Sequence, residues 1–108
     1  MTTKSNRARP SALPADLLER MANMLKLLAH THRLRIVEIL EYSDGAPVFE
    51  ITQKLGLPQA VTSQHLNAMK RVGLLNADRR GKEVWYSIAD PRALTILDCI
   101  RNKERKTR

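Results

Sequence analysis

The side chains of this chain that could act chemically are cations, amides and hydroxyls rather than nucleophiles or metal ligands. Arg79, Arg80 and Lys82 flank Gly81 and form the densest basic cluster inside the sequence. A segment from about residue 59 to 72 can form a helix of about 14 residues with one free polar face, which is long enough to lie in the major groove of DNA. Clustered cations attract phosphate, so the two features together indicate recognition of a polyanion.

A catalytic constellation is absent from the sequence. We find no Gly-rich phosphate loop, no Ser-His-acid set, no ligand cluster at metal-binding spacing and no paired carboxylates. The chain has 108 residues, which is enough for one domain but leaves little room for a closed pocket. We therefore expect a binding protein that is not an enzyme and that uses no cofactor.

The charge balance points to the same class of partner. The chain has 19 Lys and Arg against 11 Asp and Glu, which gives a net charge of +8 and a pI near 10.3. Nucleic acid is the first candidate partner, and an anionic membrane surface is the second. Aromatic residues make up only 4% of the chain, which disfavours single-strand binding by base stacking and leaves double-stranded DNA as the expected partner.

The expected compartment follows from what the sequence lacks. No apolar stretch is long enough for a membrane span or a secretory signal. Cys99 is the single cysteine, so an intrachain disulfide is impossible. These features predict a cytoplasmic protein in a reducing environment, with no membrane partner.

Prolines and glycines divide the chain into segments with clear hydrophobic periods. Residues 1–13 and 103–108 are expected to be basic, solvated tails, and residues 14–102 to form one domain. Within this domain the apolar spacing predicts helices over residues 14–28, 31–45, 47–55 and 58–72, a hairpin of residues 74–79 and 83–88, and a last helix from Asp90 and Pro91 onward.

The order of these segments predicts a fold. Only Gly56 and Leu57 separate the third helix from the fourth, which is helix-turn-helix spacing. In the third helix, Val48 or Phe49 is expected to point inward. In the hairpin, Trp85 and Tyr86 lie on opposite faces of one strand, so one of them should be core. The expected fold is mostly α with a small β-hairpin, in the order of a winged helix-turn-helix.

Three stretches of the sequence resemble the ArsR/SmtB family of bacterial transcriptional repressors. Residues 28–36 (LAHTHRLRI) are similar to the family's entry into its second helix. Residues 55–66 (LGLPQAVTSQHL), followed by 69–75 (MKRVGLL), are similar to its recognition helix and exit, and residues 79–88 (RRGKEVWYSI) to its wing. The resemblance covers roughly residues 17–100, and the three stretches together make it specific.

The resemblance implies a homodimer whose first and last helices pack across a two-fold axis. The implied interface residues are Leu17, Leu18, Met21, Leu94, Leu97 and Ile100. The apolar excess on the first and last helices agrees independently, because a lone protomer would leave part of the apolar surface of the last helix in water. The operator is then expected to be an imperfect inverted repeat with half-sites about 34 to 36 Å apart, which is one helical turn.

By the same resemblance, the base-reading positions fall on Gln59, Ala60, Ser63 and Gln64. A glutamine amide can pair with adenine and a serine hydroxyl with either kind of partner, whereas Ala60 offers at most a methyl contact to thymine. His65 is interpreted first as a packed or phosphate-bound histidine and second as a base reader.

Phosphate contacts are expected at two further places. Lys70 and Arg71 are candidates, and an ordinary solvated helix face is the alternative interpretation for both. In the wing, Arg79, Arg80 and Lys82 are expected to contact the DNA backbone or the minor groove. Thr62 is expected to face the core.

The metal sites of the family have no counterpart in this sequence. Pro47 and Phe49 stand where family metal sensors often have a cysteine pair, and no histidine follows His65 to complete a site on the last helix. His30 and His32 are the only close pair of potential ligands, and helix capping and exposure explain them adequately. We therefore expect no metal site and identify no metal or small-molecule effector.

Cys99 is the one candidate for redox sensing. Some family members that sense sulfur or oxidants keep one of two cysteines near this position, and the partner position corresponds to about Glu38 here. A bond between two Cys99 residues across the dimer, or a sulfenic acid, is therefore the only thiol chemistry open to it, with Arg101 as the local hint of activation. The ordinary interpretation is a small, semi-buried apolar residue.

The leading hypothesis is thus a sequence-specific regulator of transcription, a homodimeric repressor that binds an inverted-repeat operator. Two alternatives stay open: a winged-helix module that binds an acidic partner protein, and a thiol-responsive regulator that acts through Cys99. Selection of an inverted-repeat duplex over a scrambled one would separate DNA recognition from the protein-binding alternative.

Overall fold

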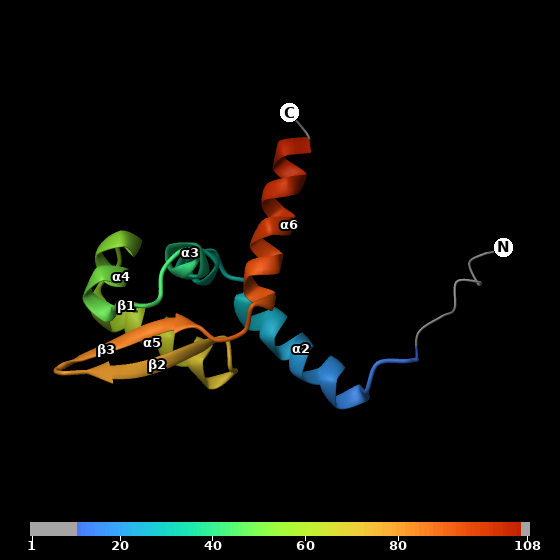
Figure 1. Ribbon diagram of the computed structural model, residues 1–108, viewed down its shortest axis with the longest axis horizontal. Helices are drawn as coiled ribbons and strands as arrows, with labels where there is room; N and C mark the ends of the chain where they lie inside the picture. Colours follow the sequence, from blue (N-terminus) through green and yellow to red (C-terminus); the bar gives the residue numbers. More distant parts are fainter. Residues whose placement is uncertain (1–10, 107–108) are drawn as a thin grey trace.

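Over residues 11–106, which are the described part of the chain, the protein folds into five helices and a three-stranded antiparallel sheet (Figure 1). The computed structural model describes only the backbone for residues 103–106. The elements are α2 (Ala15–Leu28), α3 (Thr31–Leu40), β1 (Ala46–Pro47), α4 (Val48–Leu55), α5 (Gln59–Arg71), β2 (Leu75–Arg80), β3 (Glu83–Ile88) and α6 (Arg92–Lys106). Most of the predicted tail of residues 1–13 and the end of the tail of residues 103–108 lie outside the described residues.

Helix ends follow the local chemistry that the sequence predicts. The N-cap of α3 is His30, whose Nδ1 accepts a hydrogen bond from the backbone N–H of His32 at 3.1 Å. Asp90 Oδ1 accepts one from the N–H of Arg92 at 3.0 Å and so caps α6. Gly56 ends α4 in the left-handed conformation, with φ of 74°, and donates its N–H to Thr52 O. The predicted tight turn between α4 and α5 is therefore confirmed.

The second predicted helix is shorter than the periodicity suggested. We expected it to continue to Gly45, but α3 ends at Leu40. The Oγ of Ser43 donates to Leu40 O at 3.3 Å and accepts from the N–H of Gly45 at 3.2 Å. A serine side chain that bonds nearby backbone groups competes with helical hydrogen bonds, which explains the early end.

The sheet contains a strand that the sequence analysis did not predict. Its order is β1-β3-β2, and β1 pairs with β3 so that Ala46 lies opposite Tyr86 and Pro47 opposite Trp85. The predicted hairpin is present as β2 and β3. Tyr86 is 7% exposed and is the core member of the Trp85–Tyr86 pair. A two-residue strand that contains proline has no pattern of its own, so its pairing was not visible in the sequence.

The core lies where the helices meet the inner face of the sheet. Its central residues have no exposed surface and come from α3, α4 and α5 and, at Leu74, from the turn before β2, with α2 and α6 closing the sides. The fully enclosed side chains are Ile36, Val37, Leu40, Ile51, Thr62, Leu66, Met69 and Leu74. In α4, Val48 is half-buried while Phe49 is exposed, so Val48 is the inward residue of the two.

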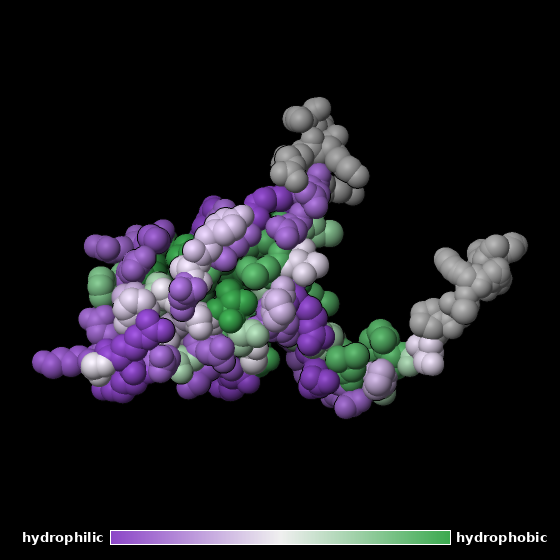
Figure 2. Space-filling view, in the orientation of Figure 1, coloured by the Kyte–Doolittle hydropathy of each residue, from purple (hydrophilic) through white to green (hydrophobic). Residues whose placement is uncertain are grey.

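Two helices project from this body on the side opposite the wing tip. Figure 1 shows α2 and α6 diverging from the part that holds α3, α4, α5 and the sheet. Hydrophobic side chains gather between the body and α6 and along α2, whereas the tip of the β2–β3 hairpin is hydrophilic (Figure 2). On this face the wing tip is therefore polar, and the apolar side chains lie toward the two projecting helices. None of the described helices combines the length and apolar character that crossing a membrane requires.

An ion pair fixes α6 to the end of α3. Arg101 donates Nη1 to Glu41 Oε2 at 2.7 Å and Nη2 to Glu41 Oε1 at 2.6 Å. The Glu41 side chain is 7% exposed. The two hydrogen bonds from Arg101 hold the pKa of Glu41 below its usual value. Planar, bidentate pairing also restricts the direction in which α6 leaves the body.

Gly45 sits at a close approach between the loop and the wing, and substitution there tests this contact. Its φ is 134°, and a Cβ would lie 3.3 Å from Tyr86 O. Gly45→Ala is expected to lower the free energy of unfolding by about 2 to 3 kcal/mol because it adds a clash to backbone strain. Gly56→Ala, whose Cβ meets nothing within 4 Å, is the matched control and should cost about 1 kcal/mol. Urea unfolding measures both, and equal losses would contradict the close approach.

Candidate nucleic-acid interface

One face of α5 is exposed along its length. Ala60, Gln64, Asn67 and Arg71 recur at three- and four-residue spacing, and all four are exposed. The opposite face is buried and consists of Thr62, His65, Leu66 and Met69. Thr62 was expected to face the core and does so, with its Oγ1 donating to Pro58 O at 3.2 Å. The buried face fixes which polar side chains α5 presents to solvent.

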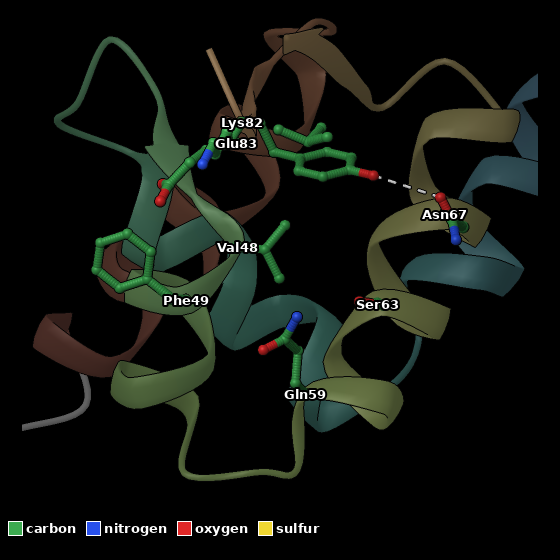
Figure 3. A pocket seen from close by; sticks show the side chains of 9 residues that line it. Val48, Phe49, Gln59, Ser63, Asn67, Lys82 and Glu83 are labelled. Atoms are coloured by element: carbon green, nitrogen blue, oxygen red, sulfur yellow. Dashed lines mark hydrogen bonds between the residues drawn. The ribbon is translucent and has the colours of Figure 1, made fainter. Parts of the chain in front are cut away.

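A groove of approximately 470 Å³ runs between α5 and the wing (Figure 3). Gln59 and Ser63 line it from α5, Lys82 from the turn between β2 and β3, and Glu83 from the start of β3. Phe49, at the start of α4, closes another side and is 54% exposed. The structure thus brings two predicted base-reading residues and one predicted wing cation to the same cavity.

A hydrogen bond connects the wing to α5 across this groove. Tyr86 Oη donates to Asn67 Oδ1 at 3.3 Å, as the dashed line in Figure 3 shows. Burial raises the pKa of the Tyr86 phenol, which therefore stays protonated and able to donate. Sequence reasoning did not place Asn67 in the site. Its spacing of three residues from Gln64 and four from Arg71 was the signal that could have found it.

The cations of the wing differ in how they are held. The guanidinium of Arg80 lies 4.4 Å from the centre of the Trp85 ring, and its Nε is 3.2 Å from Asp78 Oδ2. Arg79 and Lys82 are exposed, and within the described residues their side chains have no hydrogen bond or ion pair. Two of the three predicted wing cations are therefore free to meet an external anion, and the third is held against the strand.

His65, Lys70 and Arg71 occupy different environments. Lys70 and Arg71 are exposed in the last turn of α5, where positive charge also stabilises the helix dipole. His65 is 8% exposed, and its Nδ1 accepts a hydrogen bond from Arg33 Nε at 3.0 Å. Burial, the charge of Arg33 and the neighbouring histidines lower the pKa of His65. The structure therefore places His65 among packed side chains and not on the exposed face.

The residues expected at a dimer interface are spread between core and surface. Leu18 and Ile100 are 51% and 49% exposed, whereas Leu97 is 8% exposed and belongs to the core of the protomer. Leu17, Met21 and Leu94 are half-buried. Leu25, which we did not assign to the interface, is 52% exposed and lies seven residues after Leu18 on α2. The apolar surface of α2 is therefore larger than expected.

The candidate sensing residues are also separated. Cys99 is exposed, not semi-buried as its ordinary interpretation expected. Arg101, the nearby cation that suggested activation of the Cys99 thiol, donates hydrogen bonds to Glu41 and Asp98. Glu38, at the position of a possible partner cysteine, pairs with Arg35. Among the described residues, no three His, Cys, Asp or Glu side chains are grouped as a metal ion would require.

Comparison with known proteins identifies the family of this chain. A family model described as a helix-turn-helix domain matches residues 28–76. The transcriptional repressor PagR of Bacillus anthracis is 42% identical over 80 residues, which are 74% of this chain and 80% of PagR. The transcriptional repressor SmtB of Mycobacterium tuberculosis is 35% identical over 92 residues, which are 84% of this chain and 67% of SmtB. This chain belongs to the ArsR/SmtB family.

Solved structures of ArsR/SmtB relatives agree with the fold. A homodimeric winged helix-turn-helix DNA-binding domain from Mycobacterium bovis, described as a possible ArsR-family regulator, has a TM-score of 0.74 at 28% identity and covers 92% of this chain and 91% of that one. The crystal structure of PagR has a TM-score of 0.73 at 38% identity, covering 81% and 99%. The chain is a DNA-binding transcriptional regulator with a winged helix-turn-helix fold, and the expectation that it is not an enzyme agrees with this membership.

Proposed function

We propose that this protein is a homodimeric repressor that binds an inverted-repeat operator, with α5 in the major groove and the wing on the backbone or minor groove. The observation that carries the proposal is the groove shared by Gln59, Ser63 and Lys82. In this arrangement one strand of the duplex backbone enters the groove, the amide and hydroxyl groups of α5 reach base edges on one side, and Lys82 neutralises phosphate on the other.

The division of roles follows from exposure and charge. Gln59, Ser63 and Gln64 read bases, and Ala60 contributes a methyl contact at most. Asn67 extends the reading face by one turn, with its Oδ1 held by Tyr86. The phosphate contacts come from Lys70, Arg71, Arg79, Arg80 and Lys82, of which Arg80 alone is held by an ion pair and an aromatic ring within the described residues.

A second copy of the chain supplies the other half of the interface. Leu18, Leu25 and Ile100 are large apolar side chains about half exposed on α2 and α6. Pairing through these helices removes them from water and doubles the positive charge offered to DNA. The homodimeric state of the Mycobacterium bovis relative supports this assembly. Two α5 helices about 34 to 36 Å apart then match an inverted repeat with one helical turn between half-sites.

Selection from a randomised duplex library tests the function directly. The purified protein, at about 150 mM salt where non-specific binding is weak, is expected to enrich a two-fold symmetric motif. Sequencing the bound pool gives the motif, and a scrambled duplex of equal length is the control. A folded dimer that enriches no motif would contradict the proposal and favour the alternative of binding to an acidic protein.

Loss of base contacts should flatten discrimination between duplexes. Ser63→Ala combined with Gln64→Ala is expected to weaken binding to the selected motif by about 1 to 3 kcal/mol per lost contact, with little change for the scrambled duplex. Competition binding measures both affinities. Gln53→Ala is the matched control, because Gln53 is exposed on α4 but does not line the groove. If specific and scrambled duplexes weakened equally, the assignment of base readers would be wrong.

Loss of a phosphate contact should act on all duplexes alike. Arg79→Ala is expected to reduce the slope of log affinity against log salt by about 0.9, because one fewer counterion is released. Arg35→Ala removes the same charge on α3, where Arg35 pairs with Glu38, and should leave the slope nearly unchanged. Titrations at four or more salt concentrations give the slopes. An equal change in both variants would indicate a general charge effect instead of a wing contact.

A further inference from the structure

All three histidines of the chain meet on the inner side of α5. His65 lies on α5, and the ring of His30 is 4.8 Å from it in an edge-to-face arrangement. The ring of His32 is 5.8 Å from His65 and 5.5 Å from His30. No carboxylate forms an ion pair with any of them within the described residues. The cluster therefore lacks a negative charge that would compensate added protons.

One guanidinium on α3 contacts both α5 and α2. Arg33 of α3 donates Nε to His65 Nδ1 at 3.0 Å and Nη1 to Leu27 O at 3.2 Å. Leu27 lies in the last turn of α2, whose carbonyl groups have no partner further along the helix. Arg33 thus links α2, which carries the proposed dimer surface, to α5, which carries the proposed reading face. Among the described residues, no other side-chain hydrogen bond or ion pair connects these three helices.

The link requires a neutral His65. Nδ1 accepts a hydrogen bond, so the proton of the neutral ring is on Nε2. A second proton would occupy Nδ1, and two donors carrying positive charge would then face each other at the Arg33–His65 contact. The groups that shift the pKa of His65 downward are buried surroundings first, then Arg33 of α3, His30 of the preceding turn and His32 of α3. Leu27 of α2 contributes only a backbone carbonyl.

We propose that Arg33 is a positioning residue that holds α5 in its DNA-binding orientation through a neutral His65, and that protonation of His65 releases α5 and weakens operator binding. This inference rests on the proposed function, since it needs α5 to be the reading helix. It adds to that function a proton-sensitive connection between the dimer helix and the reading helix.

The sign of the effect separates this connection from general electrostatics. Added positive charge on a basic protein strengthens its attraction to DNA, so acidification alone should tighten binding. Release of α5 predicts the opposite for the operator. Because the pKa of His65 is lowered in the folded protein, the ring stays neutral through the ordinary histidine value of about 6.5, and the neutral state is lost only as the pH falls through the lowered pKa.

The test is operator affinity against pH at constant ionic strength. The duplex is the motif selected by this protein at pH 7.5, and the scrambled duplex is measured in parallel. Between pH 7.5 and 5.0 the wild-type protein is expected to lose about tenfold in operator affinity while its affinity for the scrambled duplex is unchanged or rises. Far-UV circular dichroism at each pH verifies that the helices remain formed.

Two variants isolate the link. His65→Gln keeps an acceptor but cannot be protonated, so its operator affinity should not fall between pH 7.5 and 5.0. Arg33→Lys keeps the charge but replaces the planar fork with a single ammonium, which cannot hold both partners in the same geometry. It should weaken operator binding at pH 7.5 by about fivefold or more. Arg35→Lys, two residues away on the same helix and exposed, should change it by less than about twofold.

Each outcome decides between the two proposals. An operator affinity that holds or rises on acidification in the wild-type protein would overturn the inference and leave the proposed function intact. The same holds if Arg33→Lys binds as the wild type does, or if the wild type loses its helices at a pH where His65→Gln stays folded. Failure to select any motif at pH 7.5 would instead overturn the proposed function, and the inference with it.

Discussion

The burial of one face of α5 is the constraint on which the rest of the interface depends. Thr62, Leu66 and Met69 have no exposed surface, so rotation of α5 about its axis would expose apolar area and open voids in the core. With the buried face fixed, a period of 3.6 residues determines which side chains face solvent. The identity of the proposed reading residues is therefore a consequence of packing on the opposite side of the same helix.

Charge in this protein is divided between internal and external uses. Arg33 and Arg101 are held by His65 and Glu41, where they connect elements that are distant in sequence, and Arg80 is held against the Trp85 ring within the hairpin. Arg79 and Lys82 project from the wing without such partners among the described residues. The same residue types thus stabilise the arrangement of helices in one place and are left exposed for the proposed phosphate contacts in another, and only their surroundings distinguish the two.

Sequence reasoning succeeded where periodicity and capping carried the signal. The helices, the tight turn at Gly56, the hairpin and the inward position of Thr62 all followed from local patterns. It failed where contacts outside the local segment determine the structure. Nothing local marks the pairing of Ala46 and Pro47 with β3, the early end of α3 depends on the side chain of Ser43, and the role of Asn67 depends on Tyr86, which is 19 residues away. The exposure of Leu25 likewise depends on how the helices of the protomer pack, so it was not visible in the sequence.

The short strand β1 has a consequence for how the sheet meets other molecules. It forms one edge of the sheet, covers β3 for only two residues and ends in Pro47, which has no N–H to offer to an added strand. The other edge, β2, carries Asp78, Arg79 and Arg80 in succession, and charged side chains oppose stacking of like edges. Neither edge is a good template for strand addition. The wing can therefore stay exposed to solvent without promoting aggregation through the edges of its sheet.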